Sequence, residues 1–179
     1  MRVITGTAKG RRLITLEGED IRPTADKVKG AIFNSIQFDI EGRCVLDLFA
    51  GSGQLGIEAL SRGARKAVFI DLSRKAVQVV NENLEHCNLK DDATVFNGDS
   101  LSFLKTTREK FDIVFIDPPY NKQLAAKALP LVLNVINDGG IIVCETARDE
   151  ELPEQIGNYK AVKSDRYSMT KLTIYRFEE

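Results

Sequence analysis

The residues best suited to chemistry are four that follow a short apolar run: Asp117, Pro118, Pro119 and Tyr120. Proline cannot continue the hydrogen bonding of a sheet, so two prolines end a strand here and stiffen the chain. The Asp117 carboxylate and the Pro118 carbonyl then become fixed acceptors beside the flat ring of Tyr120. This arrangement suits a planar base with an exocyclic amine, because two acceptors would localise the lone pair of its nitrogen. Asp117 could also take a proton as a new bond forms.

A second candidate site surrounds the glycines of the stretch from Gly51 through Gly53 to Gly56. They follow a short apolar run typical of a buried parallel strand, and a helical stretch follows them. A glycine turn before a helix is typical of nucleotide-type cofactor sites, because the backbone approaches the ligand and the helix offers free amides. Asp47 at the strand end would repel a phosphate, so it favours a ligand with amine donors or positive charge.

Two more acids follow predicted strands. Asp71 ends the next strand along the chain, where an acid can accept hydrogen bonds from both hydroxyls of a ribose. Asp99 follows the third strand, where it could meet an adenine amine or simply cap the next helix. These features fit NAD and S-adenosylmethionine equally. A NAD-dependent oxidoreductase is therefore one alternative, although it leaves the stretch from Asp117 to Tyr120 unexplained.

From Cys44 onward the pattern alternates between strands and helices. We predict strands at 44–49, 67–71, 93–97, 112–117 and 140–145, and helices at 54–62, 73–87, 100–105 and 121–137, the last kinked or split at Pro130. Such alternation predicts an α/β fold with a doubly wound, mostly parallel sheet. The tail departs from it, because 159–167 and 169–177 are predicted strands with no helix between them. They should pair antiparallel.

The N-terminal segment differs from this core. Residues 2–16 predict a β-hairpin, and Thr24 is a suitable N-cap for the helix that follows. We expect one domain, in which 1–40 form an extension and 41–179 a catalytic core. Between Met1 and Lys29 seven basic residues face four acids. This excess favours contact with an RNA backbone over scattered charges for solubility. The residues predicted to make that contact are Arg2, Lys9, Arg11, Arg12 and Arg22.

Composition limits the remaining possibilities. The chain has 179 residues and a formal net charge of −1, which suits one domain with a real core. It holds no apolar run long enough to span a membrane, and its N-terminus lacks a signal-peptide core, so we expect a cytoplasmic protein. The three cysteines lie far apart and His86 is the single histidine. We therefore expect neither disulfides nor a bound metal.

The stretch from Asp117 to Tyr120 resembles the Asp-Pro-Pro-Tyr motif of class I, S-adenosylmethionine-dependent amino-methyltransferases. Three further stretches resemble the RsmD family: Val3–Gly6 with Lys9–Leu13, Arg22–Val28, and Leu46–Ala64. The resemblance runs along nearly the whole chain. Gly30 and Ser168 depart from the family pattern. The resemblance implies a Rossmann-like class I methyltransferase fold that methylates the N2 amine of one guanine in bacterial 16S ribosomal RNA, within the assembled small subunit. We expect a monomer.

The resemblance also implies a set of site residues. Asp117, Pro118 and Tyr120 would contact the target base. The cofactor contacts would be Asp47, Phe49, Gly51, Gly53, Asp71, Leu72, Asp99 and Ser100, of which Phe49 and Leu72 rest on the resemblance alone. Two alternatives remain besides the oxidoreductase. An adenine-N6 methyltransferase acting on DNA or RNA would use the same motif, and a non-catalytic RNA-binding module would keep the fold without the chemistry.

Overall fold

The computed structural model describes residues 1–17, 23–120 and 122–179, and it is built around one sheet. The strands that it describes are β1 Cys44–Asp47, β2 Lys66–Asp71, β3 Ala93–Asn97, β4 Phe111–Ile116, β5 Ile136–Ala147, β6 Gln155–Ile156, β7 Tyr159–Arg166 and β8 Thr170–Phe177. Their order across the sheet is β3-β2-β1-β4-β5-β8-β7-β6. The strands β1 to β5 pair in parallel, and β8, β7 and β6 add an antiparallel end. The predicted fold class is therefore confirmed.

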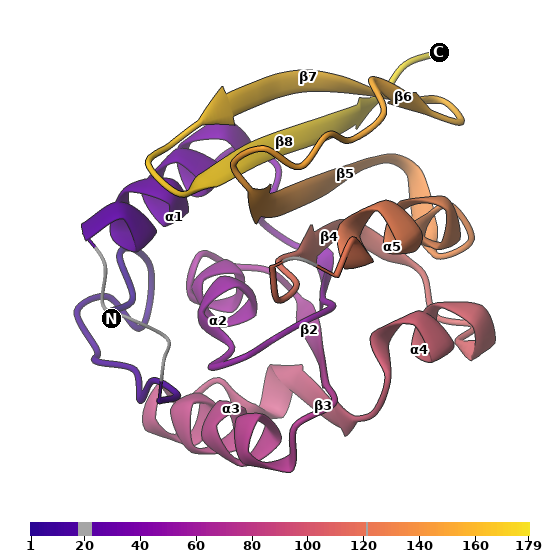
Figure 1. Ribbon diagram of the computed structural model, residues 1–179. Helices are drawn as coiled ribbons and strands as arrows, with labels where there is room; N and C mark the ends of the chain where they lie inside the picture. Colours follow the sequence, from indigo (N-terminus) through magenta and orange to yellow (C-terminus); the bar gives the residue numbers. More distant parts are fainter. Residues whose placement is uncertain (18–22, 121) are drawn as a thin grey trace.

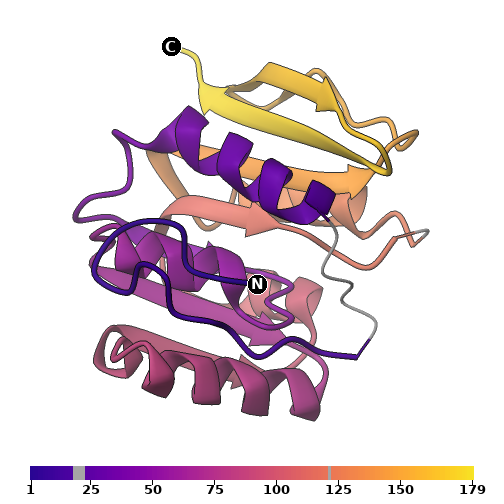
Figure 2. The ribbon, with the colours of Figure 1, turned by 90° about the vertical axis from the view of Figure 1, so that its left-hand side faces the viewer.

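Helices cover both faces of the sheet (Figure 1). They are α1 Pro23–Ile36, α2 Gln54–Ser61, α3 Arg74–His86, α4 Ser100–Thr106 and α5 Leu124–Val132, with a short 3-10 turn, η1, at Lys90–Asp92. On one face lie α1, α2 and α3, and on the other lie α4 and α5 (Figures 1 and 2). No helix in the described part of the chain is long and apolar enough to cross a membrane.

The central strands are apolar on both faces, as the short apolar runs predict. In β4, Ile113 and Phe115 join the core under α1, α2 and α3, while Val114 and Ile116 join the core under α4 and α5. Side chains alternate along a strand, so one run of residues supplies both cores. The carboxyl ends of these parallel strands meet at one edge of the sheet. In open α/β sheets that edge is where ligands bind.

The prediction of a helix at 121–137 is wrong beyond residue 132. Its first residue, Asn121, lies outside the described residues, and α5 ends at Val132. Pro130 does not split α5, but the helix ends two residues after it. The next strand, β5, begins at Ile136 and runs through Gly139 and Gly140, which the sequence pattern suggested as its boundary. The pairing of β5 with β4 shifts register between Phe111 and Ile113, and the two glycines lie within that shift.

The N-terminal arm, residues 1–17, is less regular than the predicted hairpin. Its two halves pair, but through one isolated bridge between Arg2 and Arg12 rather than through strands. Val3 and Leu13 are buried in the core under α1, α2 and α3. Gly6 has φ +93°, and a Cβ there would lie 1.7 Å from the carbonyl oxygen of Ser61. The arm is therefore packed onto α2 as part of the fold (Figure 2).

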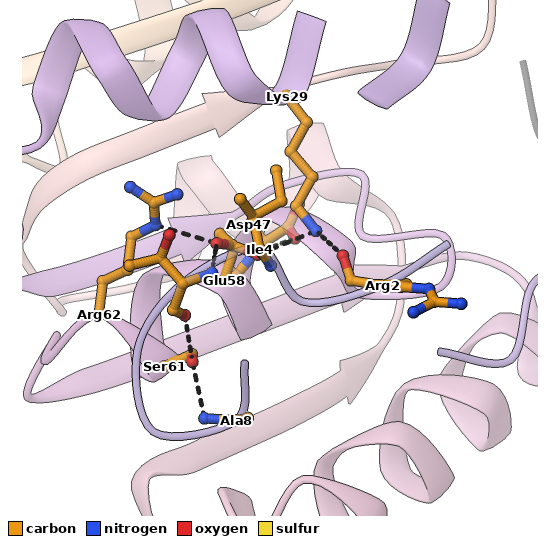
Figure 3. Close-up of polar contacts among 10 residues, drawn as sticks. Arg2, Ile4, Ala8, Lys29, Asp47, Glu58, Ser61 and Arg62 are labelled. Carbon is orange, nitrogen blue, oxygen red and sulfur yellow. Dashed lines mark hydrogen bonds and ion pairs between the residues drawn. The ribbon is translucent and has the colours of Figure 1, made fainter. Parts of the chain in front are cut away.

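A buried carboxylate fastens this arm (Figure 3). Glu58 of α2 is fully buried and accepts hydrogen bonds from the amides of Ile4, at 2.8 Å, and Thr5, at 3.0 Å. It also forms ion pairs with Lys29 of α1 and with Arg62, each at 3.0 Å. Burial lowers the pKa of Lys29, and the charge of Glu58 opposes that shift. Lys29 is thus committed to the interior and adds nothing to the basic surface counted from the sequence. The side chain of the predicted cap, Thr24, lies outside the described part.

Replacing Glu58 by alanine should destabilise the protein strongly, because it leaves Lys29 buried without its partner. Breaking a buried pair in this way costs about 3–5 kcal/mol. Urea unfolding should show the loss, and a Glu58→Leu/Lys29→Met double variant should lose less than the two single losses added together. Glu178→Ala is a matched control, because it breaks the exposed pair between Lys160 and Glu178. If Glu58→Ala unfolds at the same urea concentration as this control, the buried network does not hold the arm.

Candidate active site

A cavity of about 630 Å³ opens at the carboxyl ends of β1, β2 and β4. This volume lies within the usual range of small-molecule sites. Its walls bring together residues from both stretches singled out in the sequence: Asp47, Phe49, Gly51, Asp71, Leu72, Asp99, Ser100, Asp117, Pro118 and Tyr120. The predicted cofactor residues and the predicted base-contacting residues therefore share one cavity.

Gly53 is the predicted cofactor residue that is not part of the wall. It precedes α2 with φ 82°, and a Cβ there would press on Val80 at 3.2 Å. Its function is to turn the backbone into the helix. Gly56 allows a close approach instead, because a Cβ at this position would lie 2.3 Å from the ring of Phe69 in β2. Asp47 is buried, and its carboxylate accepts the amide of Gly56 at 3.0 Å, which holds the first turn of α2.

Asp71 organises the loops around the cavity. One carboxylate oxygen accepts the amide of Gly51 at 2.9 Å and the other accepts the amide of Ser73 at 2.8 Å. The glycine loop and the start of α3 are therefore fixed to the same acid. The side chain of Asn97 donates to the carbonyls of Asp71 and Leu72, which holds this rim in place. Leu72 leaves 73 % of its side chain exposed there. Asp71 thus presents negative charge to the cavity on a rigid support.

Asp99 and Ser100 start α4 at the cavity wall. The Asp99 carboxylate accepts the amide of Ser102 at 2.8 Å, and this hydrogen bond lowers the pKa of Asp99. The helix-cap interpretation of Asp99 is therefore confirmed, while its contact with an adenine amine stays a prediction. The hydroxyl of Ser100 donates to the carbonyl of Leu48, so it ties α4 to the residue that follows β1.

Asp117 is the first residue after β4, which places it at the cavity rim. The register pairs Asp47 with Phe115, so Asp117 lies two residues further toward the carboxyl edge than Asp47. Pro118 is buried, whereas Tyr120 leaves 39 % of its side chain exposed beside the cavity. An acid on a stiff turn beside an exposed aromatic ring is the arrangement that the sequence predicts for holding a planar base.

The predicted RNA-binding residues that the structure describes do not line the cavity. Arg2, Lys9 and Arg12 are exposed on the N-terminal arm. Arg11 is half-buried, and its guanidinium donates to the carbonyl of His86 at the end of α3. Arg22 lies outside the described residues. The arm therefore carries exposed basic side chains away from the cavity, and their contact with RNA stays a prediction.

Several wall residues have no counterpart in the sequence prediction. Leu16 and Glu17 bring the N-terminal arm to the cavity, and Gln54 and Lys122 also line it. No motif marks Leu16 and Glu17, because their place depends on how the arm packs across α2 and α3. Gln54 lies within the glycine stretch and Lys122 lies two residues after Tyr120, but neither was predicted to line a site. The arm lies outside the sheet, as predicted, but it packs against the core and forms part of the cavity wall.

Asn83 of α3 joins two parts of the wall. It is fully buried, accepts the amide of Ile14 at 2.8 Å and donates to the carbonyl of Ile14 at 2.9 Å. Its side-chain amide also donates to the carbonyl of Ser52, in the glycine loop, at 2.9 Å. The single sequence signal was a polar residue beside the apolar stripe of this helix. Asn83 fixes the arm two residues before Leu16, and it fixes the glycine loop at the same time.

Replacing Asn83 by alanine should weaken cofactor binding, because it releases the arm and the glycine loop from each other. If the lost hydrogen bonds weaken the free energy of cofactor binding by about 1.4 kcal/mol, the affinity falls roughly tenfold. Calorimetric titration with S-adenosylhomocysteine would measure it. Ser61→Ala is the matched control, because Ser61 bonds the same arm at Ala8 and Thr5, away from the cavity. An equal loss of affinity in both variants would mean that general attachment of the arm matters, not Asn83.

Comparisons with known proteins agree with this geometry. The family model described as conserved hypothetical protein 95 matches residues 1–176. The chain is 41 % identical to "Putative rRNA methyltransferase YlbH" of Bacillus subtilis, over 98 % of both chains. It is 37 % identical to "Ribosomal RNA small subunit methyltransferase D" of Haemophilus influenzae, over 98 % of this chain and 93 % of the relative. A solved structure described as "Putative methyltransferase yhhF from Escherichia coli" superposes with a TM-score of 0.89 at 32 % identity, covering 99 % of this chain and 98 % of that one.

Proposed function

The chain belongs to the family described as conserved hypothetical protein 95, and we propose that it methylates the N2 amine of a guanine in 16S ribosomal RNA. The methyl donor is S-adenosylmethionine, and the substrate is the RNA within the assembled small subunit. One observation carries the proposal: the cofactor-type loops and the stretch from Asp117 to Tyr120 line a single cavity. The relative from Haemophilus influenzae is named a small-subunit methyltransferase, which supports the choice of RNA.

The cavity suits a nucleoside cofactor with positive charge. Asp71 presents a carboxylate where ribose hydroxyls can donate to it, and Asp99 lies on the adjoining wall. The exposed side chain of Leu72 offers an apolar surface between them. S-adenosylmethionine carries no phosphate, so the site needs no residues that bind one. The carboxylates of Asp71 and Asp99 would repel the phosphates of a dinucleotide. This favours S-adenosylmethionine over a dinucleotide.

The chemistry needs orientation and proton acceptance from the protein. When bound, S-adenosylmethionine supplies a methyl group already activated on a sulfonium. The Asp117 carboxylate and the Pro118 carbonyl would hold the two hydrogens of the guanine amine, so that its lone pair points out of the ring plane. Tyr120 would stack on the base. As the new N–C bond forms, the amine loses one proton, and Asp117 is the acid placed to accept it.

The target guanine should be unpaired or turned out of its helix. In a duplex its N2 amine lies in the minor groove, where a rim residue such as Tyr120 could not stack on the base. The exposed Arg2, Lys9 and Arg12 would hold the RNA backbone next to the site. With a ribosomal substrate the enzyme would act in the cytoplasm, and we expect it to act as a monomer.

The experiment that tests this function is mass spectrometry of nucleosides from 16S RNA of cells with and without the gene. We expect N2-methylguanosine to fall by one residue per 16S molecule in the deletion strain, and to return with the parent gene. An Asp117→Ala gene is the matched control and should not restore it. Loss of N6-methyladenosine instead would support the adenine-N6 alternative, and an unchanged profile would contradict both.

Variants of Asp117 and Tyr120 should separate orientation from proton acceptance. Losing one acceptor in a preorganised site typically slows a reaction on the order of 100- to 1000-fold, so Asp117→Ala should be nearly inactive yet folded. Asp117→Asn keeps an acceptor oxygen, so it should retain some activity if orientation dominates.

Tyr120→Phe should slow methyl transfer only slightly and Tyr120→Ala should slow it strongly, because stacking uses the ring. Single-turnover transfer of labelled methyl to undermethylated small subunits measures each rate. Parent-like transfer by Asp117→Ala would refute the mechanism.

A further inference from the structure

A second carboxylate, that of Glu145, lies in β5 beside the end of β4, where Asp117 follows. The register pairs Ile116 of β4 with Cys144 of β5, so Asp117 and Glu145 are the next residues along two neighbouring parallel strands. Neighbouring strands lie about 4.8 Å apart. The two acids therefore reach the same edge of the sheet side by side. No sequence motif marked Glu145.

The Glu145 side chain lies on the face that α1 and α2 cover. Val143, two residues earlier in β5, belongs to the core on that face, and side chains alternate along a strand. On the antiparallel neighbour β8, the hydroxyl of Thr170 donates to Oε1 of Glu145 at 3.2 Å. This bond fixes one carboxylate oxygen. Phe115 of β4 lies in the same core, so Asp117, two residues later, continues along the same side.

Glu145 lacks the cations that stabilise the other deep carboxylate on this face. Glu58 pairs with Lys29 and Arg62, whereas Thr170 is the one hydrogen-bond donor to Glu145 within the described residues. Burial raises the pKa of the Glu145 carboxyl, and the Thr170 hydrogen bond opposes that shift. A half-buried carboxylate with a single donor is short of hydrogen bonds, so a ligand that brings an N–H would stabilise its charged form.

The target base should approach from the Glu145 side. The cavity lies between the glycine loop, Asp71 and Asp117, and no described residue of β5 lines it. Methyl transfer requires the donor and the amine to face each other across the new bond. The cofactor loops lie on the β1 and β2 side of Asp117, so the β5 side is left for the base. Glu145 lies on that side, two residues before the end of β5.

We propose that Glu145 is a specificity-determining residue that accepts the N1–H of the target guanine, beside the amine held by Asp117 and Pro118. The proposal rests on the proposed guanine-N2 activity. Guanine presents N1–H and its 2-amine as adjacent donors, whereas adenine presents an unprotonated N1 beside its amine. A carboxylate attracts the first edge and repels the second. A site built to bond a substrate N–H rejects an analogue without it by far more than a change in shape alone.

A base analogue makes this testable. 2-Aminopurine carries the same 2-amine as guanine, but its N1 is an unprotonated acceptor. Small-subunit RNA would be ligated with a synthetic segment that carries guanosine or 2-aminopurine riboside at the methylated position, and then assembled into subunits. Single-turnover methyl transfer would be compared for the two substrates. The parent enzyme should favour guanosine by on the order of 100-fold or more.

Glu145→Gln supplies the decisive comparison, because the amide can donate to the N1 of 2-aminopurine. It should slow transfer to guanosine, speed transfer to 2-aminopurine and bring their ratio near one or below. Affinity for S-adenosylhomocysteine and the melting temperature should stay at parent values. Glu150→Gln is the matched control, because Glu150 is also a half-buried carboxylate but lies after the end of β5. This variant should leave the ratio unchanged.

Three results would overturn the inference. The first is a Glu145→Gln enzyme in which both substrates slow equally, as a purely structural role would require. The second is a Glu145→Gln enzyme that transfers methyl groups to both substrates at the parent rates. The third is a parent enzyme that prefers 2-aminopurine, which would mean that Glu145 acts as a protonated donor. A fourth outcome, in which the parent enzyme does not methylate guanosine in any of these assays, would contradict the proposed function itself. It is distinguishable from the three results that overturn only the inference about Glu145.

Discussion

The fold depends on the charge of one buried side chain. Glu58 has no exposed surface, and a carboxylate in that position must be balanced from several sides at once. Its partners come from α1, from the end of α2 and from the amides of the N-terminal arm. Satisfying this single charge therefore draws three separate parts of the chain onto one face of the sheet. An apolar residue at this position could pack in the core, but it would not accept the amides of Ile4 and Thr5 and so would not fix the position of the arm.

The placement of the arm has a functional consequence. Once Ile4 and Thr5 are held by Glu58, the chain runs past Ser61 and Asn83 and reaches the cavity at Leu16 and Glu17. The segment that carries exposed basic residues is thus also a wall of the candidate cofactor site. RNA bound to this arm and a cofactor bound in the cavity would therefore contact the same segment, residues 1–17.

The sequence predicted the parts of this architecture that depend on local pattern. Apolar runs located the parallel strands, and glycine or proline marked the two loops of the cavity. It failed where the outcome depends on distant partners. Gly139 and Gly140 stay inside β5 because pairing with β4 tolerates a register shift. Lys29 counted as a surface charge because its partner, Glu58, lies far along the chain. No sequence pattern indicated a function for Glu145, because the proposed function depends on its position beside β4, which Asp117 follows.

In the proposed function, the acidic edge of the sheet and the basic arm would divide the recognition of an RNA substrate between them. Asp71, Asp99 and Asp117 lie at one edge, which attracts a cationic cofactor and the amine donors of a base but repels phosphate. An RNA backbone must therefore be held elsewhere, and the exposed basic residues are offset from the cavity along the arm. A base turned out of its helix extends from the backbone toward the site, so it can span that offset. A base still stacked in a duplex cannot, since its phosphates would have to enter the acidic edge with it. The separation of charge thus selects for an extruded base before any single contact reads its identity.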